Sequence, residues 1–105
     1  MNDWDLLERF THTRCERAFG ELVARHAGLV YGRCRRRLRD AHLAEDVTQA
    51  VFVLLARRPP ARRDAKSPLA GWLYRTTIFA CNNTMRAQRI RQHHEQRRAG
   101  SISRA

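Results

Sequence analysis

Apolar residues recur at spacings of three and four along most of the chain, and this period predicts a protein built almost entirely from α-helices. Trp4, Leu7 and Phe10 predict a short first helix from about Asp3 to Thr11, with Asp3 as its N-cap. The chain contains neither sustained strand alternation nor a hairpin dipeptide, so no sheet is expected.

Two longer helices are predicted to follow. The second, from about Cys15 to Arg39, has a stripe of Phe19, Leu22, Val23, His26, Val30 and Cys34. On this stripe we expect His26 to be packed and hydrogen-bonded rather than a ligand. The third is predicted from about Ala41 to Arg57 because the proline pair 59–60 ends it. Its predicted core stripe is Leu43, Val47, Ala50, Val51 and Leu54.

All three prolines lie between residues 59 and 68 and mark a basic loop, PPARRDAKSP. Ser67 is the expected N-cap of a fourth helix that runs from about Leu69 to His93, with Pro68 at its first position. Its predicted core stripe is Leu69, Leu73, Thr76, Ala80, Asn83 or Thr84, and Ala87. Residues 96–105 lack an apolar period and are predicted to be a disordered tail or the start of a linker. The predicted fold class is all-α, a small bundle of three to four helices over residues 1–95.

The third helix carries a second distinctive face, opposite its predicted core. This face combines Asp46, Gln49, Phe52 and Val53. An aromatic residue beside an aliphatic one, with a polar rim, is typical of a protein-docking patch. The alternative is that Phe52 packs against the first helix or the loop.

The fourth helix also presents a face away from its predicted core, with Arg75, Asn82 and Arg86 on it and Phe79 and Trp72 at its edge. Arginines interleaved with aromatic rings suit single-stranded nucleic acid, because cations hold the backbone and bases stack on the rings. Asn82 could also read a base edge. The preceding segment adds the cations Arg57, Arg58, Arg62, Arg63 and Lys66. The alternative is an ordinary solvated basic face.

The chain of 105 residues fits one domain that is too small for a large enclosed catalytic pocket. Its net charge of +11 is uneven, because residues 1–56 have a net charge of +1 and residues 57–105 a net charge of +10. Such asymmetry indicates a polyanionic partner, the alternative being a merely soluble basic surface.

Several classes of function are not expected. No apolar run approaches the roughly 20 residues of a membrane span, and no signal core is present, so a cytoplasmic protein is predicted. Cys15, Cys34 and Cys81 form no CxxC pair, so neither a disulfide framework nor a zinc site is expected. The chain lacks a phosphate loop, GxSxG and HExxH, so we expect no enzyme and no cofactor.

Three stretches in this order resemble region 2 of the bacterial sigma-70 family, specifically its extracytoplasmic-function (group IV) members. They are ERAFGELVARHAGLVYGRCRRRL, AEDVTQAVFVLLARR and LAGWLYRTTIFACNNTMRA, and the resemblance extends from about Asp3 to Arg98. It implies a transcription initiation factor that works with core RNA polymerase. The family's DxxQxxF pattern matches Asp46, Gln49 and Phe52. The resemblance therefore implies that this face, with Val53, docks on the clamp helices of the polymerase β′ subunit.

The resemblance further implies that the loop and the fourth helix bind the non-template strand of the −10 promoter element, help to melt the duplex and capture a flipped base. By position, Arg75, Phe79, Asn82, Asn83 and Arg86 would lie along the DNA, Trp72 would support the helix, and the loop 59–68 would build the pocket. Two features depart from the family. Phe79 stands where relatives often carry a polar residue, and the loop lacks an aromatic that some members use.

Complete members of this group carry a second helical domain, region 4, which nothing after His94 encodes. We therefore expect an N-terminal piece of a longer protein, the alternative being a natural variant without that domain. Two alternatives remain open at this point. One is an interaction module that binds polymerase or an anti-sigma factor without productive promoter use. The other is a nonspecific basic nucleic-acid binder, which would not need the Asp46–Gln49–Phe52 face.

Overall fold

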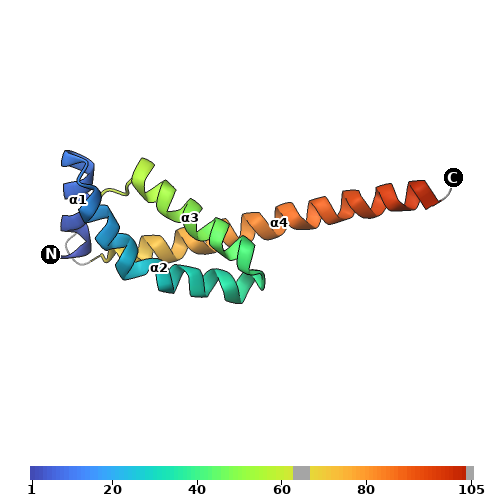
Figure 1. Cartoon of the computed structure of the whole chain (residues 1–105), viewed down its shortest axis with the longest axis horizontal. Helices are drawn as coiled ribbons and strands as arrows, with labels where there is room; N and C mark the ends of the chain where they lie inside the picture. The colour runs from blue at the N-terminus through green and yellow to red at the C-terminus, as the bar shows by residue number, and fades with distance from the viewer. Residues whose placement is uncertain (63–66, 104–105) are drawn as a thin grey trace.

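The computed structural model describes residues 1–62 and 67–103 and folds them into four α-helices, with no strand among them. The helices are α1 (Asp3–Thr13), α2 (Glu16–Leu38), α3 (Ala41–Arg57) and α4 (Leu69–Ser103). The central helix α2 packs against α1, α3 and α4, and α3 also packs against α4 (Figure 1). The predicted all-α bundle is confirmed.

Local side-chain chemistry determines where the helices begin and end. Asn2, rather than Asp3, caps α1: its side chain accepts from the Asp5 N–H at 2.8 Å, and Asp5 accepts from the Asn2 N–H at 3.2 Å. Arg39 ends α2 in the left-handed conformation (φ 56°), and Asp40 caps α3 by accepting from the Leu43 N–H at 3.0 Å. Two residues therefore reverse the chain between α2 and α3, and the predicted bounds of α3 are confirmed.

His26 is held against the start of α1. Its Nε2 lies 2.7 Å from Asp3 Oδ2, and Asp3 Oδ1 accepts from Arg25 Nη1 at 3.1 Å. The side chain of His26 is only 12% exposed. The prediction of a packed, hydrogen-bonded histidine is confirmed, and the pair fixes the first turn of α1 on α2.

The core receives apolar side chains from every helix. It consists of Trp4, Leu6 and Leu7 from α1, Ala18, Leu22, Val30 and Cys34 from α2, Ala44, Val47, Val51, Phe52 and Leu55 from α3, and Leu69, Leu73 and Cys81 from α4. The buried hydroxyl of Thr77 has a hydrogen-bond partner in its own helix, because it donates to the Leu73 carbonyl at 2.6 Å.

The rotation of α3 about its axis differs from the prediction. Val47 and Val51 are buried as expected, but Ala50 is exposed and Leu54 is 39% exposed. Phe52 is only 7% exposed, so the prediction that it faces away from the core is wrong. The cause lies in residues 50–55, AVFVLL, which are apolar on all sides of the helix and leave its inward face undefined by period alone.

The stripe of α4 is also shifted beyond Leu73. Thr77 and Cys81 are buried where the prediction had Thr76 and Ala80. The buried Cys81 Sγ lies 3.8 Å from Cys34 Sγ on α2. Burial, together with the neighbouring thiol, raises the pKa of Cys81 to about 12. Cys81 is therefore a neutral thiol, and both free cysteines fill the core as small side chains.

The C-terminal half of α4 projects beyond the bundle and makes the molecule elongated, with extents of 64 × 24 × 22 Å (Figure 1). The predicted end of this helix near His93 and the predicted disordered tail are corrected for residues 96–103, which continue the helix. Residues 104–105 lie outside the described residues. Arginine, glutamine and glutamate favour helix even without an apolar stripe. None of the helices in the described ranges is long and apolar enough to cross a membrane.

Candidate functional site

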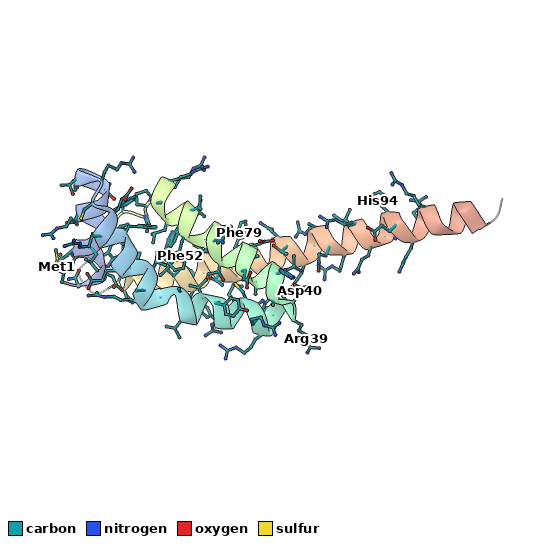
Figure 2. All side chains as sticks on the ribbon, viewed as in Figure 1. Met1, Arg39, Asp40, Phe52, Phe79 and His94 are labelled. Atoms are coloured by element: carbon teal, nitrogen blue, oxygen red, sulfur yellow. The ribbon has the colours of Figure 1, made fainter. Side chains whose placement is uncertain are left out.

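The first candidate surface is an apolar groove between α2 and α3, with a volume of about 540 Å³. Its lining residues are Phe19, Val23 and Ala27 on α2 and Thr48, Gln49, Phe52, Val53, Ala56 and Arg57 on α3. Three of the four residues predicted to dock on a partner, Gln49, Phe52 and Val53, are thus brought together. Figure 2 shows Phe52 on the inner part of α3, within the bundle.

The four predicted docking residues differ in exposure. Gln49 is exposed and Val53 is 48% exposed, whereas Phe52 belongs mainly to the core. Asp46 is exposed but does not line the groove. A partner would therefore meet Gln49 and Val53 first and reach only the margin of the Phe52 ring.

The second candidate surface is the outer face of α4. Arg75, Phe79, Asn82, Asn83 and Arg86 are all exposed, as predicted. Phe79 is 68% exposed, the largest exposure of any aromatic ring among the exposed hydrophobic residues that the structure describes. This ring lies in the first third of α4, in the part of the helix that belongs to the bundle (Figure 2). A cation, an aromatic face and an amide therefore follow one another along the helix, with a further cation one turn beyond them.

A pocket of about 590 Å³ lies at the start of α4, beside this face. It is lined by Trp4 from α1, Pro60, Ala61, Ser67 and Pro68 from the loop, and Trp72 and Arg75 from α4. The indole Nε1 of Trp4 donates to the Ser67 carbonyl at 2.7 Å and so holds the end of the loop. The half-buried Trp72 supports one wall, and the Arg75 guanidinium lies close to Gly71, where an added Cβ would come within 3.3 Å of Nη1.

The structure describes three of the five cations that were predicted to contribute to DNA binding from the segment before α4. Arg57 and Arg58 are exposed at the end of α3, and Arg57 lines the α2–α3 groove rather than the pocket at α4. Arg62 is exposed and lines a smaller pocket against α1. Arg63 and Lys66 lie outside the described residues.

Two residues at this site were not predicted. Trp4 was assigned only to the core stripe of α1, although a buried indole N–H requires a partner, and here that partner is in the loop. Arg37, in the last turn of α2, is not among the predicted site residues, but its Nη2 donates to Asn82 Oδ1 on α4 at 2.5 Å. A neighbouring arginine, Arg33, lies over the Tyr74 ring with its Cζ 4.2 Å from the ring centroid. The charge run in α2 was visible in the sequence, but its proximity to α4 was not.

Comparison with known proteins identifies the family. The model of Sigma-70 region 2 matches residues 22–91. The RNA polymerase sigma factor CarQ of Myxococcus xanthus is 35% identical over 83 residues, which make up 79% of this chain and 47% of that protein. The chain therefore spans about half the length of the curated relative that it matches. No solved structure gives a significant match. Because the family match covers about two thirds of the chain, with most of α2, all of α3 and the bundled part of α4, this chain belongs to the sigma-70 family and carries its region 2.

Proposed function

We propose that this chain is the part of a sigma factor that docks on the β′ clamp helices of core RNA polymerase and binds the non-template strand of the −10 promoter element as the duplex melts. The name of its relative, an RNA polymerase sigma factor, supports the polymerase part of the proposal. Neither step is a covalent reaction: each needs only binding surfaces of suitable shape and charge.

The observation that carries the DNA part is the pocket between Trp4, Trp72 and Arg75, which opens beside the face of Phe79 and Asn82. A base that leaves the duplex loses its stacking, and an aromatic-walled pocket restores part of that interaction. Phe79 can stack on a further base, and Arg75 and Arg86 can neutralise phosphates. The arrangement would therefore favour the open strand over the duplex.

The α2–α3 groove supports the docking part of the proposal. It is mostly apolar, it is rimmed by Gln49, and Val53 is exposed beside it. Grooves of this kind accept the apolar face of a partner helix, with polar groups at the rim fixing its register. The clamp helices would occupy this groove, and an anti-sigma factor that used the same residues would compete with them.

Binding of the chain to a β′ clamp-helix fragment and to a labelled −10 oligonucleotide tests both parts. Gln49→Ala and Val53→Ala should weaken binding to the fragment, with unchanged thermal stability, because both side chains are exposed. Phe79→Ala should weaken binding to every strand by roughly 1–3 kcal/mol, the usual loss for one stacking ring. Arg17→Ala, at an exposed position in the first turn of α2, is the control for both.

The outcomes separate the proposed function from its alternatives. Binding to the fragment without selective binding to single strands would indicate an interaction module. A chain that does not bind the clamp fragment, and that binds single strands equally well with and without the fragment present, would be a nonspecific basic binder. Only binding to both supports the sigma factor function.

A further inference from the structure

The last turn of α2 reaches α4 through one specific contact. Arg37 Nη2 donates to Asn82 Oδ1 at 2.5 Å, and both side chains are exposed. Arg37 belongs to a group of exposed arginines at the C-terminal end of α2, with Arg35, Arg36 and Arg39. Among the described residues, the carboxylates Asp3 and Glu21 instead pair with Arg25, and Asp3 also pairs with His26. Arg37 therefore uses a neutral amide as its partner on the face of α4 proposed to read DNA.

The chemistry of this pair fixes the orientation of the amide. A guanidinium has only N–H donors, so the Asn82 atom that faces it has to be the carbonyl oxygen. The Nδ2 group, with its two N–H donors, is then the part of the amide left for another partner. Without the guanidinium, the amide could turn about its last torsion, which is broad and roughly two-fold, and present either edge.

The two orientations suit different bases. Asparagine reads adenine through a paired contact, in which its oxygen accepts from N6 while its amide donates to N7. Guanine presents two neighbouring acceptors, O6 and N7, and suits a group that only donates. The Asn82 oxygen has two lone pairs and Arg37 takes one of them; the positive charge of Arg37 also repels the partly positive amino hydrogens of adenine N6, so the paired adenine contact is weakened and the donor contact to guanine is favoured.

We propose that Arg37 is a positioning residue that holds Asn82 as a hydrogen-bond donor toward the DNA strand, so that α4 prefers guanine to adenine at the base beside Asn82. The proposal rests on the proposed function, since it assumes that the outer face of α4 lies along a single strand. The C-terminal end of α2 would thus contribute to base specificity, because Arg37 orients the side chain of Asn82.

Fluorescence anisotropy with the complete 105-residue chain tests the proposal. The labelled oligonucleotides differ at one position, scanned along the strand, which carries guanine, adenine or 7-deazaguanine, a guanine without the N7 acceptor. We expect one position where guanine binds at least about fivefold more tightly than adenine, as one good base contact provides. At that position an oligonucleotide with 7-deazaguanine should bind less tightly than one with guanine. The Asn82→Ala variant should bind the guanine and adenine oligonucleotides equally.

Variants of the pair separate positioning from charge. Arg37→Ala should bring the guanine-to-adenine ratio close to one, whereas Arg37→Lys, which retains a donor and a charge, should preserve most of it. Arg36→Ala is the matched control, because it removes the same charge from the neighbouring position without touching Asn82; it should lower all affinities alike and leave the ratio unchanged. All these side chains are exposed, so the variants should fold.

Three binding results would overturn the proposal, and they differ from one another. If Arg37→Ala keeps the ratio that Asn82→Ala abolishes, Asn82 reads the base unaided and the proposed function stands. A preference for adenine at the position that depends on Asn82 would show the opposite amide orientation. If the wild-type chain binds no strand, the proposed function fails with it. In the free chain, the NMR resonances of the Asn82 side-chain amide should move in Arg37→Ala and not in Arg36→Ala; unmoved resonances would exclude the pair itself.

Discussion

At the scale of single residues, the exposure of a side chain and the identity of its partner have different physical causes. Arg75, Phe79 and Asn82 are exposed as expected, because each is rotated by about 100° or more around the helix axis from the buried residues that end the stripe of α4. Trp4 and Arg37 were missed because their partners, Ser67 and Asn82, are distant in sequence. Periodicity places a residue on a face of its own helix, but it does not tell which other element covers that face.

Phe52 shows how one aromatic residue can serve both core and surface. It is 7% exposed and also lines the α2–α3 groove. Phe52→Ala should lower the free energy of unfolding by about 3 kcal/mol or more, because a buried ring leaves a cavity. Val53→Ala, with a side chain that is 48% exposed, should change it by at most about 0.5 kcal/mol. Urea unfolding of both variants checks this, and equal midpoints would place Phe52 outside the core.

The buried thiol of Cys81 predicts a loss of stability at alkaline pH. Its pKa rises from an ordinary value of 9.0 to about 12 in the folded chain. Between these values the unfolded chain releases a proton that the folded chain keeps, so the free energy of unfolding falls as pH rises; below them both states are protonated and no change arises. Cys81→Ala should flatten the fall between pH 9 and 11. Parallel curves for the variant and wild type would mean that Cys81 does not titrate differently on unfolding.

At the scale of helices, the first and last residues of a helix were easier to predict than the face that it turns toward the core. Pro59 and Pro60 end α3 through a local steric rule, and its bounds were predicted without error. Its rotation was not, because six consecutive apolar residues over 50–55 allow several inward faces, and only contact with α2 and α4 selects one. The extension of α4 to Ser103 was missed for a related reason: an unpacked helix needs no apolar stripe.

Asp40 is expected to carry much of the stability of the α2–α3 turn. It caps α3 directly after Arg39, whose left-handed backbone ends α2. Asp40→Ala should lower the free energy of unfolding by about 1 kcal/mol, since the Leu43 N–H would lose its acceptor. Asp40→Ser, which can still accept, should retain most of the stability. Denaturant unfolding of the pair is the measurement, and equal losses would assign the effect to charge rather than capping.

At the scale of the whole molecule, charge was the most informative feature of the sequence. The net charge of +10 over residues 57–105 coincides with α4 and the loop before it, the segments proposed to bind DNA. The α2–α3 groove, by contrast, is lined mostly by apolar residues from the half with a net charge of +1. The two proposed partners, a polyanion and a protein helix, therefore meet surfaces of different chemistry.

This separation predicts that the salt dependence of DNA binding is set by the cations on the proposed DNA face and not by the net charge of the whole chain. Binding of single-stranded DNA should weaken as salt rises, because each phosphate contact releases a condensed counterion, with a slope of about 0.7 per contact in a plot of log affinity against log salt concentration. If Arg75 contacts a phosphate, Arg75→Glu should reduce the slope by about that amount.

Arg17→Glu changes the net charge identically but lies at an exposed position in the first turn of α2, and it lines neither the pocket at α4 nor the α2–α3 groove. A molecule attracted to DNA by net charge alone would respond equally to both substitutions. A molecule that binds along α4 would lose slope only in Arg75→Glu, while Arg17→Glu shifted the affinity slightly at low salt and not at high salt, where distant charges are screened. Titrations of a −10 oligonucleotide across a range of salt concentrations distinguish the two, and equal slopes for the two variants would contradict a DNA path over α4.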